Sequence, residues 1–259
     1  AEGSKGLRSI QRKGSNSFEA LNEPIILDGP YSNSAFDIVC KNDKVYMIIG
    51  GKDLLNGKRF DKGGYILTYD YDKWSFIDPK EAQKKLNLPR NPRDYTSIAV
   101  TTDDSNDEIV YASSMGDGVI QYKNGTPVQS YNEKNAFKET AGGYGSGYCY
   151  IDGLAFDKNG NLWMTSSEVN HAVLVLDKAG AWHRLDIEQL RGVYTINDIL
   201  ITSTNDKWIY VPRNTPKLVM IPNSESLDEV SSYEFTTLID TDGKELTPSN
   251  YTCVAEDKD

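Results

Sequence analysis

The sequence predicts an all-β protein of the β-propeller class, built from four-stranded antiparallel sheets that are called blades. Residues 150–187 contain four short apolar runs separated by breaks rich in Gly, Asp and Asn. Each run is too short for a helix, and the residues in the breaks favour tight turns. The pattern recurs about every fifty residues along the chain. Because one small sheet is only marginally stable in water, the copies are expected to pack against one another.

The recurrence is defined by the first strand of each unit. Positions equivalent to Leu154 occur at Ile38, Ile98, Ile199 and Cys253, with spacings of 60, 56, 45 and 54 residues. A period of this size with four strands per repeat is typical of a propeller.

Taken in order, the blades are expected at residues 35–77, 95–131, 150–185 and 197–235, and the first strand of a fifth blade at 251–259. Each complete blade has four apolar or alternating runs of strand length. These runs are 35–40, 45–49, 65–69 and 74–77; 97–101, 109–113, 119–122 and 128–131; 153–157, 162–166, 172–176 and 182–185; and 198–202, 208–212, 217–221 and 232–235.

Residues 1–34 form an N-terminal segment that is expected to be partly disordered or to contribute edge strands. Two interpretations of the ring remain open. Either the chain is a fragment of a longer propeller, which is preferred, or residues 1–34 complete the last blade through strand-like runs at 17–21 and 24–27.

The loops differ in length between the two ends of the blades. Turns between first and second strands, and between third and fourth strands, are mostly short, whereas the other connections are generally long. Within one long connection, Asp78 followed by Pro79 predicts a capped short helix. Long loops gathered on one face of a rigid scaffold commonly carry binding residues. One rim is therefore the expected recognition face.

Composition narrows the class of partner. The chain has 28 basic and 38 acidic residues, a net charge of −10, and no Lys or Arg block longer than Lys84–Lys85. Nucleic acid and anionic membrane surfaces are therefore disfavoured as partners. No apolar run approaches the roughly 18 residues of a membrane span. No signal peptide opens the chain, which suggests a removed leader or a piece of something longer.

The three cysteines form no metal-binding pattern. Cys40, Cys149 and Cys253 are expected to be small buried hydrophobic residues, and whether any two form a disulfide is left open. No cofactor and no metal are expected.

Cationic residues on the long loops are candidates for contact with an anionic ligand, because the chain is acidic overall. Lys52, Lys58 and Arg59 lie in one such loop, and Arg213 and Asn214 lie in another. Solvated loop charge is the alternative interpretation.

Two further loops supply candidates. Tyr144 and Tyr148 belong to a Gly-rich loop and could form platforms for a sugar ring or a partner chain, or simply cover the blade below. Asn170 and His171 lie together in a loop on the expected recognition face.

No pattern in the chain indicates catalysis. There is no GxSxG or HExxH motif, and the acidic residues are too scattered to identify a general acid and base pair. The expectation is therefore a protein that is not an enzyme. A metal-dependent propeller lactonase or lyase would need Asn197, Asp198 and acidic loop residues to converge on one ion.

Three segments resemble a known family. The sequences DGLAFDKNGNLWMTSS (152–167), AGAWHRL (179–185) and TCVAEDKD (252–259) resemble the two-component regulator propeller repeats of Bacteroidetes, and more closely the propeller part of PorZ-type proteins of the type IX secretion system. The resemblance implies two large propellers in the parent protein, location in the periplasm or at the outer surface, and no enzymatic activity. PorZ-type proteins are associated with a complex that attaches cargo to anionic lipopolysaccharide.

The resulting functional hypothesis is a non-catalytic binding or scaffold module of an exported bacterial protein. It would bind a partner protein or an anionic surface glycan on its long-loop face, and the remainder of the parent polypeptide would complete the propeller. The alternatives are the periplasmic oligosaccharide-sensing propeller of a hybrid two-component receptor and the metal-dependent lactonase or lyase.

Overall fold

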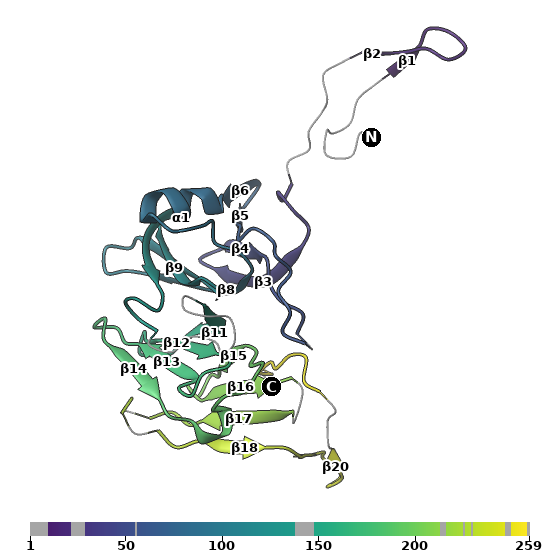
Figure 1. Ribbon diagram of the computed structural model, residues 1–259. Helices are drawn as coiled ribbons and strands as arrows, with labels where there is room; N and C mark the ends of the chain where they lie inside the picture. The colour runs from purple at the N-terminus through teal and green to yellow at the C-terminus, as the bar shows by residue number, and fades with distance from the viewer. Residues whose placement is uncertain are drawn as a thin grey trace.

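The computed structural model of the protein describes residues 10–21, 29–54, 56–137, 148–212, 216–224, 226–228, 230–246 and 250–257. Short antiparallel strands dominate these residues (Figure 1). None of the helices that they form has the length and apolarity needed to cross a bilayer.

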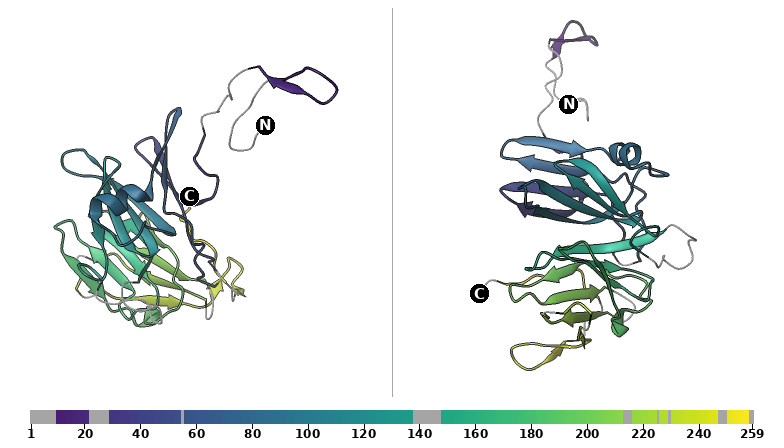
Figure 2. Two further views of the ribbon diagram at one scale, coloured as in Figure 1. Left: turned by 45° about the horizontal axis from the view of Figure 1, so that its top comes forward. Right: turned by 90° about the vertical axis from the view of Figure 1, so that its left-hand side faces the viewer.

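Among the described residues, the strands of the body of the molecule fall into four consecutive antiparallel meanders of four strands each. Their strands are β3 (Ala35–Lys41), β4 (Lys44–Ile49), β5 (Ile66–Asp70) and β6 (Lys73–Ile77) in blade 1; β7 (Tyr95–Thr102), β8 (Glu108–Gly116), β9 (Gly118–Lys123) and β10 (Thr126–Tyr131) in blade 2; β11 (Cys149–Phe156), β12 (Leu162–Ser166), β13 (Val173–Leu176) and β14 (Trp182–Leu185) in blade 3; and β15 (Ile199–Ile201), β16 (Lys207–Val211), β17 (Lys217–Ile221) and β18 (Tyr233–Phe235) in blade 4. Figure 2 shows the sheets following one another from blue to yellow.

Strand β11 departs from the prediction because it joins two blades. Its first residues, Cys149 and Tyr150, pair with Gly116 and Met115 of β8, and its last three residues pair with β12. A bulge lies between Ile151 and Leu154. Bulges bend a strand and increase its twist, so blades 2 and 3 share one strongly curved sheet.

The hydrophobic core lies between the blades. Tyr46 and Ile66 of blade 1 pack with Ile98, Ile120 and Tyr122 of blade 2. Two further clusters fill the spaces between blades 2 and 3 and between blades 3 and 4. Each buried aliphatic or aromatic side chain contributes about 1.5–3 kcal/mol through removal of apolar surface from water. The blades therefore stabilise one another, as expected for radial packing.

Helix α1 (Pro79–Leu86) confirms the predicted capped helix. The Asp78 carboxylate accepts a hydrogen bond from Lys80 N at 2.9 Å, and Pro79 occupies the first turn. Asn87 ends the helix in a left-handed conformation. Buried Ala82 joins the core between blades 1 and 2, so the helix covers that core at the long-loop end.

The described N-terminal residues form a hairpin. Strands β1 (Ile10–Arg12) and β2 (Phe18–Ala20) pair with each other, and no described blade strand pairs with them. All six of their residues are exposed, and Figure 1 shows the hairpin away from the blades. The strand-like run at residues 24–27 lies outside the described residues.

The expected first strand of a fifth blade is not formed by residues 251–257, because no strand among the described residues pairs with them. Isolated hydrogen bonds hold the segment in place of strand pairing. Tyr251 N donates to Pro212 O at 3.2 Å, and Ser203 N donates to the Glu256 carboxylate at 2.7 Å. The preceding loop contains an unpredicted hairpin of β19 (Leu238–Ile239) and β20 (Glu245–Leu246).

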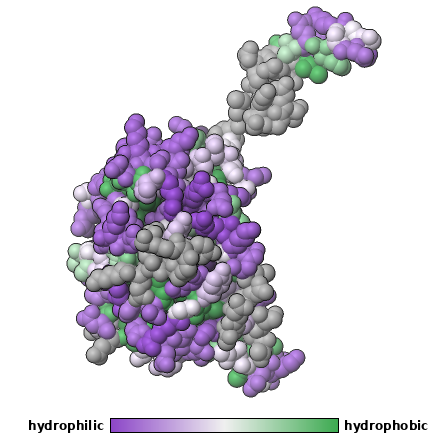
Figure 3. All heavy atoms as spheres, in the orientation of Figure 1, coloured by the Kyte–Doolittle hydropathy of each residue, from purple (hydrophilic) through white to green (hydrophobic). Residues whose placement is uncertain are grey.

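The cysteines are all free thiols. Cys149 is buried, as expected, whereas Cys40 and Cys253 are exposed, which corrects the expectation for these two. Cys40 lies on β3, whose outer face has no neighbouring blade among the described residues, and Cys253 lies in the segment that forms no strand. Figure 3 shows a mainly hydrophilic face, in keeping with the high charge content.

Candidate functional site

A cavity of about 500 Å³ opens among the long loops. We call it the loop-face cavity. The β4–β5 loop, β8, β11, the β12–β13 loop and the segment before β15 all contribute to it. Its lining residues are Asn56, Gly57, Lys58, Arg59, Asp61, Met115, Tyr150, Glu168 and Tyr194.

The β4–β5 loop reaches from blade 1 to blades 3 and 4, and Lys52 anchors it there. The Lys52 ammonium forms an ion pair with Asp152 and donates to Ile196 O at 2.7 Å. Lys52 is only 2% exposed. Burial raises the pKa of Asp152, and Lys52 together with the Ser167 hydroxyl opposes that rise. Lys52 thus positions the loop and does not line the loop-face cavity.

The tip of the same loop needs a glycine. Gly57 has φ +68°, and a Cβ at this position would lie 2.7 Å from Thr195 Oγ1. The Gly57 N–H donates to Asp53 O at 2.8 Å, which closes the tip. The absence of a side chain therefore allows the tip to approach Thr195 and Tyr194 closely.

Arg59, which lines the cavity, contacts Tyr148 beside it, and both are predicted site residues. The guanidinium carbon of Arg59 lies 5.7 Å from the Tyr148 ring centroid, and that of Arg90 lies 5.0 Å from it. Arg90 is held by an ion pair with Asp117 at 2.7 Å. Arg59 Nη2 lies 3.4 Å from Asp61 Oδ1. Two arginines and one aromatic ring thus form a cationic edge.

Glu168 and Tyr194 also line the loop-face cavity. Glu168 has φ 62°, and its N–H donates to Val193 O at 2.8 Å. Burial, followed by the charge of Asp152, raises the pKa of Glu168. Tyr194 is 53% exposed and presents a ring at the opening.

The remaining candidates fall into two groups. Asn170 is exposed and His171 half-buried; both share the β12–β13 loop with Glu168 but do not line the cavity. Tyr144, Arg213 and Asn214 lie outside the described residues.

The structure therefore brings together Lys58, Arg59 and Tyr148. Sequence reasoning missed Glu168 and Tyr194. Tyr194 carried a usable signal, because it is an aromatic residue in a long connection on the rim where binding is expected. No local pattern marked Glu168.

A smaller cavity of about 260 Å³ lies where the first strands of the blades converge. Its lining includes Asp37, Lys52, Asp152, Asn197 and Asp198. Asp198 reaches water, yet protein surrounds it on most sides. This surrounding, followed by the Asp37 carboxylate, raises the pKa of Asp198 to about 7. Among the described residues, no group of three or more His, Cys, Asp or Glu side chains could hold a metal ion.

Comparison with known proteins shows the fold. No family model and no curated protein matches the sequence. The structure is similar to PorZ, a bacterial surface component of the type-IX secretion system of Porphyromonas gingivalis, with a TM-score of 0.72 and 20% identity over 95% of this chain and 33% of that chain. It is also similar to the extracellular domain of a putative hybrid two-component system from B. thetaiotaomicron, with a TM-score of 0.52 and 15% identity over 79% of this chain and 25% of that chain.

These similarities confirm, at the level of the fold, the resemblance to PorZ-type and two-component regulator propellers. The chain spans about a third of the length of PorZ and about a quarter of the second protein.

Proposed function

We propose that the chain is the propeller module of an exported, non-catalytic binding protein, and that its loop-face cavity holds an acidic group of a surface glycan. The observation that carries this proposal is the cationic edge of the cavity, where Arg59 and Arg90 flank the Tyr148 ring. An acidic sugar combines a negative group for the arginines with apolar ring faces for tyrosines.

Lys58 supplies the cavity with a positive charge for an anionic ligand. Lys58 is exposed and forms no ion pair with any residue that the structure describes. Arg93 lies near the same edge, with Nη1 4.0 Å from Asp61 Oδ1.

The structural neighbours support the proposal that the protein is exported. One is named as a bacterial surface component and the other as an extracellular domain, and both contain propellers of this kind. An exported protein that meets glycans outside the cytoplasm is compatible with each description.

Further blades from the remainder of the parent polypeptide would cover the outer face of blade 1. Ile38, Phe76 and Tyr31 are 57%, 49% and 57% exposed, and the Tyr31 and Phe76 rings stack at 4.7 Å. Exposed apolar side chains gathered on a sheet face favour burial against a neighbour.

Titration calorimetry with acidic and neutral oligosaccharides tests the proposal. We expect the acidic sugars to bind the wild-type chain, with at least tenfold weaker binding for Arg59→Ala and Lys58→Ala. Lys84→Ala, which removes the same charge from exposed helix α1, should bind like the wild type.

Failure of every acidic sugar to bind would contradict the proposal. Capture of an acidic protein by the wild type but not by Arg59→Ala would instead identify a partner protein as the ligand.

The second candidate is the sensor propeller of a hybrid two-component receptor. The fold similarity to the extracellular domain, with a TM-score of 0.52, supports it. In that case Arg59→Ala and Lys58→Ala should have little effect on the binding of acidic sugars.

A further inference from the structure

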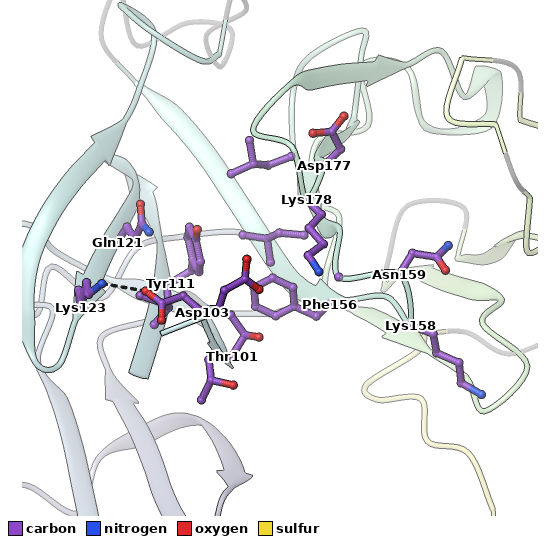
Figure 4. Close-up of a pocket in the computed structure, with 16 residues that line it drawn as sticks. Thr101, Asp103, Tyr111, Gln121, Lys123, Phe156, Lys158, Asn159, Asp177 and Lys178 are labelled. Atoms are coloured by element: carbon purple, nitrogen blue, oxygen red, sulfur yellow. Dashed lines mark hydrogen bonds and ion pairs between the residues drawn. The ribbon is translucent and has the colours of Figure 1, made fainter. Parts of the chain in front are cut away.

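A second cavity lies on the opposite rim, among the short turns of blades 2 and 3, and has a volume of about 570 Å³ (Figure 4). We call it the interblade cavity. The β7–β8 turn, β8 and β9 line one side, and the end of β11, the β11–β12 turn and the residues after β13 line the other. Its volume is within the range of small-molecule binding sites in proteins.

An aromatic ring forms the floor of this cavity. The Phe156 ring is half-buried and lies near the centre of the view in Figure 4. Tyr111 supports it edge-on, with ring centroids 5.8 Å apart, and Tyr131 stacks on Tyr111 at 6.4 Å. Because Tyr111 is 9% exposed, Phe156 is the ring that a ligand can reach.

Polar side chains with donor or acceptor atoms that no described residue uses line the same cavity. The Gln121 side-chain carbonyl accepts a hydrogen bond from the Tyr131 hydroxyl at 2.9 Å, while its N–H groups donate to no described residue. The Lys178 ammonium likewise forms no bond within the described part of the chain, and Figure 4 shows its side chain reaching toward Phe156. Asp104 is exposed and also without a side-chain partner there.

Three other charged side chains of the lining, Lys123, Asp103 and Asp177, already have partners of opposite charge. Lys123 Nζ lies 2.8 Å from the Asp103 carboxylate and 2.7 Å from that of Asp107. Asp177 accepts from the His183 ring at 3.0 Å. The lining contains the aspartates 103, 104 and 177 and the lysines 123, 158 and 178, so opposite charges balance. A charged ligand gains little from such a set.

These observations define the chemistry of the ligand. A neutral sugar residue presents an apolar ring face, which packs against an aromatic side chain. Its hydroxyl groups both donate and accept hydrogen bonds, which matches amide, ammonium and carboxylate groups around the ring. We infer that the interblade cavity is a second binding site that takes a neutral saccharide against Phe156, with its hydroxyls bonded to Gln121, Asp104 and Lys178.

This site is independent of the loop-face cavity, because the two lie on opposite rims and share no lining residue. A chain with both sites could bind two parts of one glycan or two separate glycans.

Saturation-transfer NMR and titration calorimetry test the inference, with neutral gluco- and galacto-oligosaccharides of two to six residues as probes. We expect binding to the wild-type chain, and at least tenfold weaker binding for Phe156→Leu, which keeps apolar volume but removes the ring. Lys178→Ala changes an exposed side chain and should weaken binding several-fold without affecting folding.

The controls separate this site from the proposed function. Arg59→Ala should leave binding of the neutral sugars unchanged, and Lys178→Ala should leave binding of acidic sugars at the loop face unchanged. The inference is overturned if no neutral probe binds the wild type, or if Lys178→Ala and a folded Phe156→Leu both bind as tightly as the wild type. Loss of neutral-sugar binding in Arg59→Ala would also overturn it.

Discussion

At the scale of single residues, the buried ion pair between Lys52 and Asp152 links two distant parts of the chain. The Lys52 and Asp152 side chains are 2% and 1% exposed. Removing one member of such a pair leaves a buried charge without compensation, which is more damaging than replacing both. The pair therefore determines where the β4–β5 loop lies.

We predict that Lys52→Met lowers the free energy of unfolding by about 3 kcal/mol, because it leaves Asp152 buried and unpaired. Urea denaturation measures this change. The double variant Lys52→Met/Asp152→Leu should recover part of the loss, and the exposed control Lys84→Met should change little. Equal stability of Lys52→Met and the wild type would show that the loop is anchored in another way.

The raised pKa of Asp198 predicts that the stability of the folded protein depends on pH. The surrounding protein and the Asp37 carboxylate raise the pKa of Asp198 from 3.8 to about 7, and Asp152 adds to this rise while Lys52 opposes it. The folded protein therefore binds a proton more tightly than the unfolded chain between these pH values. This contribution to stability is complete below about pH 4 and is lost as pH rises through about 7.

In the wild type, loss of the Asp198 proton should lower the free energy of unfolding between pH 5 and 8. Asp198→Asn has no carboxyl to titrate and should not show this contribution. Because water reaches Asp198, the effect should be smaller than for a fully enclosed carboxylate. Denaturation at both pH values measures the decline, and NMR titration of the Asp198 carboxyl measures its pKa. A carboxyl that titrates near pH 4 would contradict the prediction.

At the scale of elements, strand β11 determines how closely neighbouring blades approach. A Cβ added at Gly153 would lie 2.7 Å from Ile199 N and 2.7 Å from Asp198 Oδ1. The backbone atom cannot move without shifting β15, so only glycine fits between blades 3 and 4.

Gly153→Ala should therefore lower the free energy of unfolding by about 1–3 kcal/mol, as overpacking does in cores. Thermal or urea denaturation measures this loss. Gly29→Ala is the matched control, since no atom lies within 4 Å of its added Cβ, and it should leave stability unchanged. A Gly153→Ala protein as stable as this control would mean that the two blades can separate at small cost.

Helix α1 illustrates an element that its own residues specify. The Asp78 cap, Pro79 and the buried Ala82 follow one another within five positions, so local rules suffice to predict it. Strand β11 illustrates the opposite case. Its pairing with β8 depends on residues 33 or more positions away, and no local pattern reports that partner.

At the scale of the whole molecule, the blades share their hydrophobic cores and should unfold together. Ile120 of blade 2 is fully buried and packs with Tyr46 and Ile66 of blade 1. A cavity made at this position removes contacts from both blades.

Ile120→Ala should lower the free energy of unfolding by about 2–5 kcal/mol and should reduce amide hydrogen-exchange protection in blade 1 as well as in blade 2. Ile10→Ala, in the exposed β1–β2 hairpin where Ile10 is 60% exposed, should change neither quantity. A loss of protection confined to blade 2 would show that the blades behave as separate units.

Sequence by itself determined the properties that depend on near neighbours. Alternating apolar runs and turn residues specified the meanders, the loop lengths specified which rim carries the long loops, and Asp78 with Pro79 specified the helix. These features follow from the backbone preferences of a few adjacent residues. Charge on the long loops also identified Lys58 and Arg59, which line the loop-face cavity.

Only the tertiary structure decided which distant side chains meet. It placed Lys52 against Asp152, 100 positions away, and it placed Arg59 beside Tyr148. It also brought Phe156 of blade 3 next to Tyr111 of blade 2, opening a cavity that no motif had marked. The physical reason is that these contacts depend on the relative positions of whole blades, which arise from packing across their shared cores and not from the residues beside each side chain.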